Sequence, residues 1–437
     1  MVTNIRKTAL EMLRSYEEEG RYVNLLLSSP KLKKIAKEEL SSLTALLYTT
    51  VENKLRYDYL ISSYSKRSIS EIDPYVRDVL RIGVCQILDM ESVPDFAAVN
   101  ESVKLARHGG EAGFINAVLR KISKEKENLP YPKREKNIHR YLSVIYSVPY
   151  STVKLLSSIL GADECEKLLS AFASKQGISL TVNEAKISTD ALIEKLSSFG
   201  AKRAPFTSNG VELEKSVAPK SLPGFDGGEF FVQDEASRIA ASALDVREGD
   251  VVVDVCSAPG GKALAAAIKA SVNGEVFAFD LHESKLSLIT ESAERLGLKN
   301  LKVNARDARE PDEELFLKAD RVICDVPCSG LGVFAKKPDL RYKDLSGISD
   351  LPPLQYEILE KSALYLKPGG VLVYSTCTLN PEENEKITDR FVSEHSEFEY
   401  ASVEIGGLNF DSGRITLLPH KHGTDGFYIA KLRKKDE

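Results

Sequence analysis

Two cysteines in the last third of the chain have the surroundings of catalytic nucleophiles. Cys328 follows the apolar run 321–326, and Cys377 follows the apolar run 371–374. Both runs have the length and composition of buried strands, so each thiol would stand where a strand ends. The two strands would be neighbours in a parallel sheet, and we expect both thiols to face one crevice. Two thiols at adjacent carboxyl ends are hard to explain as packing, which favours a functional role for the pair.

A glycine turn precedes both cysteines. Residues 251–262 read Val-Val-Val-Asp-Val-Cys-Ser-Ala-Pro-Gly-Gly-Lys, which predicts a strand, a turn and a helix start. This is the first unit of a doubly wound α/β sheet, in which ligands bind outside the strand ends. Neither the dinucleotide fingerprint nor the phosphate-loop spacing is present, which disfavours a nicotinamide or NTP site. An ordinary tight turn is the alternative for this segment taken alone.

Three successive predicted strands end in an aspartate. These are Asp254, Asp280 at the end of 275–280 and Asp307 at the end of 301–307. Asp280 lies 26 residues after Asp254, close to the interval at which such sheets place a carboxylate on a ribose. Asp307 would then meet an adenine amino group. Each aspartate alone is as well explained by a helix cap, but three in succession favour a nucleoside ligand.

The rest of this region completes the sheet. Residues 231–237 open a helix before the first strand, and Asn380-Pro-Glu-Glu-Asn-Glu predicts another helix start. The runs 415–419 and 426–432 predict an antiparallel hairpin. An antiparallel seventh strand is typical of S-adenosylmethionine methyltransferases rather than dehydrogenases. We expect an α/β Rossmann-like seven-stranded sheet, with Cys256 and Cys324 as small buried hydrophobes.

The first third of the chain predicts helices. Apolar stripes with i, i+3, i+4 and i+7 spacing begin at Ile5 and at Val76. Asp73 can cap a helix that starts at Pro74. Two polar residues in these apolar helices, Asn100 and Asn116, are expected to fix helix packing by hydrogen bonds rather than to touch RNA. The ordered motifs resemble the all-helical fold of the antitermination factor NusB, which implies an RNA-binding module; they are Asn53-x4-Asp58, 75–88, Val93-Pro94, 99–107 and 113–120.

A basic stretch and a small mixed piece follow. Residues 121–140 hold seven Lys or Arg against three Glu, and prolines interrupt any continuous helix there. The stretch is either a solvated surface or a face that contacts phosphates. Strands at 178–182 and 211–213 around a helix at 191–199 predict a small α+β domain.

Composition sets broad limits. With 437 residues the chain predicts two or three domains. A net charge of −5 means that any RNA contact must come from a local basic surface. The sequence shows no signal peptide, no membrane-spanning run and no disulfide or zinc spacing, so we expect a reducing cytoplasm and no metal. His395, His420 and His422 fit no metal spacing either.

Several catalytic motifs together resemble those of the RNA 5-methylcytosine methyltransferases. They are Asp-Val-Cys-Ser-Ala-Pro-Gly-Gly-Lys, Asp-Val-Pro-Cys-Ser-Gly, Lys337-Pro-Asp-Leu-Arg-Tyr, Leu354-Gln and Ser-Thr-Cys-Thr-Leu-Asn-Pro-Glu-Glu-Asn. A NusB-like domain ahead of them is similar to the RsmB (Sun) branch, which modifies bacterial small-subunit ribosomal RNA. The middle piece looks like that family's pre-domain, although members commonly have arginine where this chain has Thr181. The expected domains are 1–127 (NusB-like), 128–222 (basic linker and pre-domain) and 223–437 (methyltransferase).

This resemblance implies a site and its partners. Cys377 would be the nucleophile, Cys328 would assist proton removal or adduct release, and Asp325 and Lys262 would support the cytosine and the crevice potential. S-adenosylmethionine would be held by Cys256, Ser257, Ala258, Pro259, Gly260, Gly261, Lys262, Asp280, Asp307 and Asp325. The partner would be small-subunit ribosomal RNA, and the protein would be a monomer without a membrane or metal partner.

Two alternatives stay open beside this reading. A non-catalytic RNA-binding or antitermination factor is the alternative from another class, and the intact cysteines, Asp325 and the glycine turn argue against it. A transfer RNA or large-subunit RNA substrate is the other, and the NusB-like module argues against that.

Overall fold

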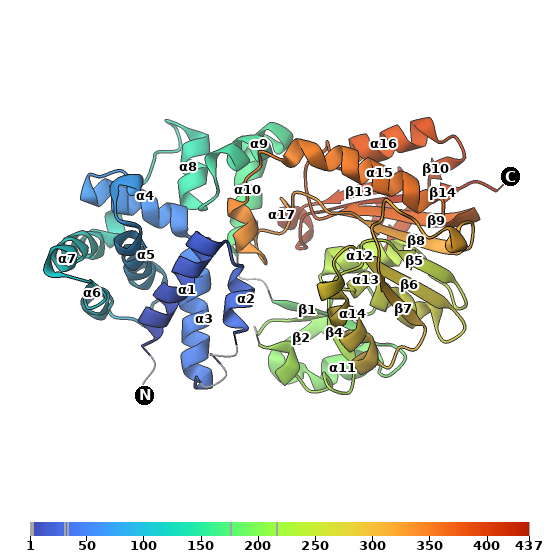
Figure 1. Ribbon diagram of the computed structural model, residues 1–437, viewed down its shortest axis with the longest axis horizontal. Helices are drawn as coiled ribbons and strands as arrows, with labels where there is room; N and C mark the ends of the chain where they lie inside the picture. Colours follow the sequence, from blue (N-terminus) through green and yellow to red (C-terminus); the bar gives the residue numbers. More distant parts are fainter. Residues whose placement is uncertain (1–3, 30–31, 33–34, 175–176, 216, 437) are drawn as a thin grey trace. The chain divides into compact units, whose positions relative to one another are not determined.

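The computed structural model describes the chain apart from residues 1–3, 30–31, 33–34, 175–176, 216 and 437 (Figure 1). It divides into two compact units. Unit 1 consists of Met1–Ala173 together with Lys337–Lys343, and unit 2 consists of Ser174–Lys336 together with Asp344–Glu437. The three-domain division at residues 127 and 222 stays a prediction.

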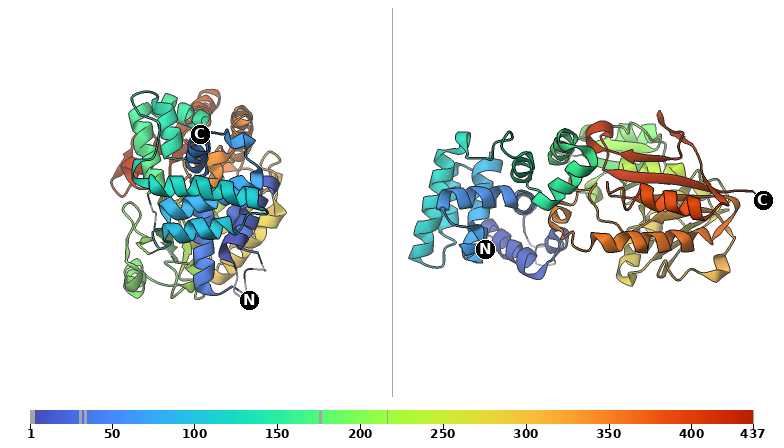
Figure 2. Two further views of the ribbon diagram at one scale, coloured as in Figure 1. Left: turned by 90° about the vertical axis from the view of Figure 1, so that its left-hand side faces the viewer. Right: turned by 90° about the horizontal axis from the view of Figure 1, so that it is seen from above.

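The described residues of unit 1 form helices, as the periodicity predicted (Figures 1 and 2). The inward side chains of the two stripes, such as Ala9 and Leu13 of α1 and Val79 of α5, have no exposed surface. Asp73 caps α5 by accepting hydrogen bonds from two backbone N–H groups, which confirms the start at Pro74. The helices are α1 (Ile5–Glu19), α2 (Val23–Leu27), α3 (Lys37–Glu52), α4 (Lys54–Ser65), η2 (Ile69–Glu71), α5 (Pro74–Asp89), α6 (Asp95–Val103), α7 (Gly109–Lys124), η3 (Lys126–Asn128), α8 (Ile138–Ile145), α9 (Tyr150–Leu160), α10 (Ala162–Ala173) and η7 (Pro338–Tyr342).

The predicted roles of two asparagines in unit 1 need correction. Asn100 is exposed on α6, and Asn116 accepts a hydrogen bond from Arg120 of its own helix at 2.8 Å. The expectation that they join helices was therefore wrong. Buried polar contacts between helices come from other residues, such as Arg81 of α5, which pairs with Asp58 of α4.

The basic stretch 121–140 is partly neutralised. Arg134 pairs with Asp163 at 2.6 Å and with Glu166 at 2.9 Å, and Lys126 pairs with Asp95 at 3.1 Å. Lys121, Lys133 and Lys136 remain exposed. Phosphate contact by this stretch stays a prediction.

The segment Lys337–Lys343 follows Cys328 in the chain but folds with the helices of unit 1. The buried Arg341 guanidinium donates to the Glu52 side chain at 2.8 Å. The Tyr342 hydroxyl donates to the backbone carbonyl of Glu52, at the end of α3, at 2.7 Å. A part of the chain that the sequence order assigns to the methyltransferase region is thus anchored in the helical unit.

Unit 2 begins with a small antiparallel sheet in the order β2-β3-β1-β4. Its strands are β1 (Ile178–Val182), β2 (Ala201–Arg203), β3 (Gly210–Leu213) and β4 (Phe230–Val232), with α11 (Thr189–Lys195), η4 (Ser197–Phe199) and η5 (Pro219–Ser221). The predicted strands at 178–182 and 211–213 are confirmed. The predicted helix at 191–199 ends at Lys195 and continues only as a 3-10 turn.

The start of the next helix differs from the prediction. Residues 230–232 pair with β1 as β4, and α12 (Glu235–Ala243) begins only after the Asp234 cap. Thr181 of β1 has no exposed surface. Its hydroxyl donates to Gln233 at 2.7 Å and accepts from the buried Arg238 at 2.9 Å. The side chain at this position therefore faces the interior of the unit.

The large sheet of unit 2 has the order β10-β14-β9-β8-β5-β6-β7, and β13 also pairs with β14 (Figure 1). Pairing is parallel from β9 to β7 and antiparallel at β14. The strands are β5 (Val251–Asp254), β6 (Glu275–Asp280), β7 (Leu301–Ala305), β8 (Ala319–Asp325), β9 (Leu366–Thr376), β10 (Phe398–Tyr400), β13 (Arg414–Leu417) and β14 (Phe427–Lys434). The α/β class is confirmed, but the sheet has eight strands instead of seven. The eighth forms because β13 covers only the first half of β14, and β10 pairs with the rest.

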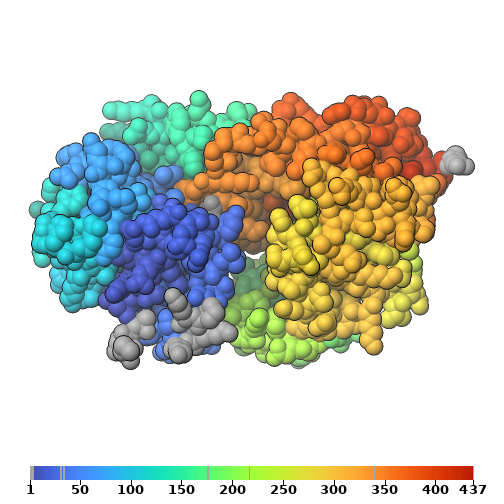
Figure 3. All heavy atoms as spheres, viewed as in Figure 1, coloured from blue at the N-terminus to red at the C-terminus, as the bar shows by residue number. Residues whose placement is uncertain are grey.

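Helices cover both faces of this sheet, which explains its nearly continuous apolar strands. Alternate residues of β8 point to opposite sides: Val322 joins the core that contains Leu359 and Phe391, and Ile323 joins the core that contains Ala263. The remaining elements are α13 (Gly261–Ala270), α14 (Glu283–Leu296), η6 (Glu313–Leu315), η8 (Ile348–Asp350), α15 (Leu351–Ala363), α16 (Glu385–Glu394), α17 (Pro419–His422) and the hairpin β11 (Val403–Ile405) and β12 (Leu408–Phe410). Most residues of α14 are exposed, and this helix lies among the yellow atoms at the surface in Figure 3.

The helix expected at Asn380 starts later. Residues 381–384 form turns, and α16 begins at Glu385. The side chain of Asn384 holds this turn, since it accepts from the Thr376 hydroxyl at 2.6 Å and donates to the Thr378 carbonyl at 3.0 Å. The buried hydrogen bonds of Asn384 therefore outweigh the local preference of residues 380–384 for a helix start.

Candidate active site

The two predicted cysteines lie side by side. β8 and β9 are parallel neighbours, and the loops that follow them place Cys328 Sγ 3.3 Å from Cys377 Sγ. Both side chains are half-buried, and all six cysteines of the chain are free of disulfide bonds. The expectation that the two thiols lie together at the ends of neighbouring strands is therefore confirmed; that both face one crevice stays a prediction.

The surroundings of Cys328 favour the thiol over the thiolate. Its hydrogen bond with Cys377, then burial, then the charges of Cys377, Glu383 and Asp325 raise the pKa of Cys328 well above its ordinary value. A proton is thus held at Cys328, beside the sulfur of Cys377.

Asp325 and Lys262 form an ion pair at the ends of neighbouring elements. Asp325 ends β8, Lys262 lies in the first turn of α13, and their Oδ2 and Nζ atoms are 2.7 Å apart. The Ser375 hydroxyl donates to Asp325 Oδ1 at 2.6 Å. The Lys262 ammonium also lies 5.1 Å from the centre of the Phe427 ring. The Asp325 side chain is 30% exposed, so it can still meet a ligand.

Asp254 is buried behind this pair at the end of β5. Burial raises its pKa to about 7, against the opposing charge of Lys262 and with a further increase from Asp325. Its Oδ1 atom has no hydrogen-bond partner among the described residues. Three ionisable groups of β5, α13 and β8 therefore share one corner of the sheet.

The predicted turn follows Asp254 directly. Cys256, Ser257, Ala258 and Pro259 lead from β5 to Gly260, which has a φ of +106° and precedes α13. A Cβ atom at Gly260 would lie 3.1 Å from Ile289, and one at Gly261 would lie 3.3 Å from the Gln233 amide. Glycine is thus favoured here both by backbone conformation and by space.

Asp280 and Asp307 differ in their surroundings. Asp280, 8% exposed at the end of β6, accepts backbone N–H bonds from Ala258 at 3.1 Å and from His282 at 3.0 Å. It is therefore tied to the glycine turn. Asp307 lies beyond β7, and its pKa is lowered chiefly by hydrogen bonds from the Arg309 side chain and backbone. The described contacts do not join Asp307 to the rest of the group.

The other two cysteines of this sheet are poorly suited to react. Burial raises the pKa of Cys324, which has no exposed surface, to about 12. Burial also raises the pKa of Cys256 well above its ordinary value. Cys324 is a buried small hydrophobe, as the sequence indicated.

A buried polar network lies behind the two reactive loops, and the sequence did not predict it. Glu383, Asn380, Gln355, Ser329 and Thr378 are each 6% exposed or less and hydrogen-bond one another. Ser375 and Phe427 were missed as well. The Asn-Pro-Glu-Glu-Asn motif was the available signal, but it was interpreted as a helix start.

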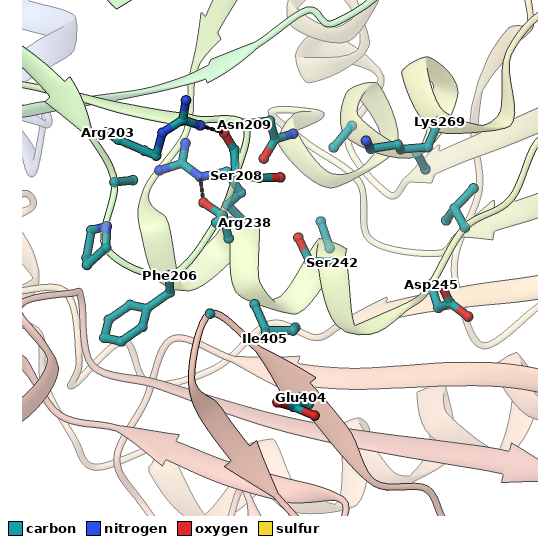
Figure 4. A pocket seen from close by; sticks show the side chains of 18 residues that line it. Arg203, Phe206, Ser208, Asn209, Arg238, Ser242, Asp245, Lys269, Glu404 and Ile405 are labelled. Atoms are coloured by element: carbon teal, nitrogen blue, oxygen red, sulfur yellow. Dashed lines mark hydrogen bonds between the residues drawn. The ribbon is translucent and has the colours of Figure 1, made fainter. Parts of the chain in front are cut away.

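A cavity of about 620 Å³ lies elsewhere in unit 2 (Figure 4). Its lining residues include Arg203, Phe206, Lys269 and Glu404, and none of the predicted site residues is among them.

No helix among the described residues is long and apolar enough to cross a membrane. Among the residues that the structure describes, no three His, Cys, Asp or Glu side chains lie close enough together to hold a metal ion.

Comparison with known proteins assigns both regions to families. Residues 241–433 match the family described as 16S rRNA methyltransferase RsmB/F, and residues 3–124 match the NusB family. The probable ribosomal RNA small subunit methyltransferase B of Bacillus subtilis (strain 168) is 35% identical over 448 aligned residues, which cover 99% of each chain.

Two solved structures share this fold over much of the chain. The crystal structure of PH0851 covers 99% of this chain and 100% of its own, with a TM-score of 0.81 and 26% identity. NSun6 from Pyrococcus horikoshii, solved with SFG, covers 66% of this chain and 99% of its own, with a TM-score of 0.57 and 25% identity.

Proposed function

We propose that this chain, which belongs to the RsmB/F family of 16S rRNA methyltransferases, methylates carbon 5 of a cytidine in small-subunit ribosomal RNA through a covalent cysteine adduct. S-adenosylmethionine-dependent methylation of 16S rRNA follows from the family. The base, the atom and the covalent route are our proposal. The observation that carries it is the 3.3 Å separation of the two sulfur atoms at the ends of adjacent strands.

Carbon 5 of cytosine is a weak nucleophile, and a cysteine can activate it. The sulfur of Cys377 adds to carbon 6 and forms an S–C bond, which turns the ring into an enamine whose carbon 5 can attack a methyl group. After methyl transfer the proton on carbon 5 is removed, the electron pair of that C–H bond restores the ring double bond, and the S–C bond breaks. Cys328 assists this last stage: its thiol, protonated because its pKa is raised, gives a proton to the departing Cys377 sulfur, and the resulting Cys328 thiolate takes up the proton from carbon 5.

Asp325 and Lys262 would support the base. The Asp325 carboxylate can hydrogen-bond the cytosine and stabilise positive charge at the ring nitrogen. Lys262 holds Asp325 at 2.7 Å, and its positive charge also favours thiolate formation in the crevice.

The residues of the glycine turn fit S-adenosylmethionine, which supplies the electrophilic methyl group when bound. The glycines of the turn from Cys256 to Gly261 let the backbone approach a ligand closely, and the unpaired Asp254 oxygen leaves a buried acceptor beside the turn. Asp280 keeps lone pairs for two ribose hydroxyls. Asp307 would accept the adenine amino group while Arg309 holds its carboxylate.

The substrate must present an unstacked base, at a cost of a few kcal/mol. We propose that phosphate contacts offset this cost. They would be made by the NusB-like region, residues 1–127, and by the pre-domain, residues 128–222. We further propose that the protein acts as a monomer in the cytoplasm.

Nucleoside mass spectrometry after transfer of labelled methyl to 16S rRNA tests the base and the atom. The expected product is 5-methylcytidine, and a different methylated nucleoside would refute the assignment. Cys377→Ser should abolish transfer. Cys328→Ser should trap a protein–RNA adduct that survives a denaturing gel, and absence of that adduct would remove the release role.

A further inference from the structure

Glu383 is a fully buried carboxylate that touches the loop of each catalytic cysteine. It accepts hydrogen bonds from the Ser329 backbone N–H at 2.9 Å and from the Ser329 hydroxyl at 2.6 Å. It also accepts from the side-chain amides of Asn380 and Gln355, each at 3.0 Å. Glu383 has no exposed surface, so these four donors account for its solvation.

The hydroxyl bonds run in one direction between the two loops. Because the Ser329 hydroxyl donates to Glu383, the Thr378 hydroxyl must donate to Ser329 across their 2.6 Å contact. Thr378 in turn accepts the backbone N–H of Asn380 at 3.4 Å. Ser329 and Thr378 directly follow Cys328 and Cys377 in the chain. The carboxylate therefore fixes the residue next to each sulfur.

Neighbouring contacts hold the same loops from other sides. Gln355 donates to the carbonyl of Pro327, just before Cys328, at 2.9 Å. The backbone N–H of Gly332 donates to the Cys377 carbonyl, also at 2.9 Å. Glu383 is the point where the side-chain bonds from both loops meet.

The chemistry of this position requires a carboxylate. All four partners of Glu383 are donors, and a carboxylate offers only acceptors. Glutamine at this position would aim an N–H₂ group at a donor and leave at least one buried donor unpaired. A buried charge that served packing alone could be replaced by apolar groups at little cost, so the arrangement points to a requirement for defined loop geometry.

We propose that Glu383 is a positioning residue that holds the Cys328 and Cys377 loops together, so that both sulfurs can act on one base. This rests on the proposed covalent function. The negative charge of Glu383 also contributes, after the hydrogen bond with Cys377 and burial, to the raised pKa of Cys328. It thus helps to keep a proton on Cys328.

A dithiol probe tests the geometry without any methyl transfer. Phenylarsine oxide binds two adjacent thiols by forming two As–S bonds with loss of one water, and no electrons are exchanged. We expect the wild-type chain to retain it against mercaptoethanol, and Cys328→Ser and Cys377→Ser to lose it. Glu383→Gln should weaken retention at least tenfold because the sulfurs are no longer held together.

The matched control is Glu235→Gln. Glu235 is an equally buried glutamate of unit 2 that bonds to Thr207 and Arg238 and to neither cysteine loop. This variant should lose stability but retain the arsenical as the wild type does. Thr378→Val, a smaller change that removes one hydroxyl, should shift retention in the same direction as Glu383→Gln and serves if that variant does not fold.

Kinetics distinguish positioning from simple loss of fold. Glu383→Gln should lower kcat by 10- to 100-fold and accumulate the RNA adduct, while KM for RNA and for S-adenosylmethionine stays within twofold, because small loop displacements cost rate more than binding. Wild-type retention of the arsenical together with wild-type kcat in Glu383→Gln would overturn the proposal. Retained methyl transfer by Cys377→Ser would instead refute the covalent function and leave the arsenical result standing.

Discussion

Asp254 makes the stability of unit 2 depend on pH in an unusual direction. The side chain is 1% exposed, and burial raises its pKa from 3.8 to about 7 despite the positive charge of Lys262. From about pH 4 to pH 7 the folded protein therefore keeps a proton that the unfolded chain has lost. Stability from this group is fully present below pH 4 and falls as the pH rises through this window.

The size of the effect follows from the shift. Each pH unit well inside the window costs about 1.4 kcal/mol, and the slope halves as the pH reaches the folded pKa, so the loss between pH 5 and pH 7 is about 2 kcal/mol. Asp254→Asn has no charge to bury and escapes this loss. The variant should thus gain about 2 kcal/mol on the wild type between pH 5 and pH 7, and the difference should level off above pH 7.

Urea unfolding from pH 5 to pH 8 measures this difference. Pulse-labelling hydrogen exchange with mass spectrometry on peptides from β5 and β6 assigns the transition to the sheet, because a chain of two units need not unfold in one step. Asp320→Asn is the control. Burial opposes the shift there, but bonds from the Val251 N–H and from Lys367 keep the pKa of Asp320 low. Because Asp320 is then ionised in both the folded and the unfolded chain, the stability difference between Asp320→Asn and wild type should stay constant from pH 5 to pH 8. A constant difference between Asp254→Asn and wild type from pH 5 to pH 8 would refute the reasoning.

Two further changes test the cofactor end and the loop geometry. Asp280→Ala should weaken S-adenosylmethionine binding more than tenfold by calorimetry, because the carboxylate holds the turn and, in our proposal, the ribose. RNA affinity should stay unchanged, and equal cofactor affinity would contradict the ribose assignment. Gly332→Ala should lower methyl transfer at least 100-fold, because a Cβ atom there would lie 1.9 Å from the Gly426 carbonyl oxygen and 2.9 Å from that of Cys377. Gly113→Ala, where a Cβ atom meets nothing within 4 Å, is its control, and equal activity of both variants would contradict a role for the close approach.

Much of the fold could be predicted because its signals are local. The stripes from Ile5 and Val76 and the cap at Asp73 need only neighbouring residues, and the structure confirms them. The apolar runs before Cys328 and Cys377 predicted adjacent strands because both faces of such strands are buried. Short elements such as β2 and β4 could not be predicted, since three residues carry no periodicity and their pairing with β3 and β1 is non-local.

The features of the fold that could not be predicted depend on contacts between residues distant in sequence. The pairing of β10 with the second half of β14 depends on how far β13 extends, which no local pattern indicates. The anchoring of Arg341 and Tyr342 by Glu52 joins residues almost 300 positions apart in sequence. The residue types predicted that Cys328 would lie near Cys377 and Lys262 near Asp325, because strand ends converge at one edge of a parallel sheet.

The turn at Asn380–Asn384 shows why the support of a site is harder to predict than its reactive groups. Asparagine, proline and two glutamates in succession are favoured at a helix start by hydrogen bonding and by the helix dipole. The structure uses the same groups differently: Asn384 bonds to Thr376 and Thr378, and Glu383 bonds to Ser329 and Gln355. A carboxylate that would favour a helix start in solvent is buried instead and solvated by donors from three segments. Because Ser329 and Gln355 are distant from Glu383 in sequence, the pattern alone favours the helix, and only the assembled loops reveal the carboxylate that joins the two cysteines.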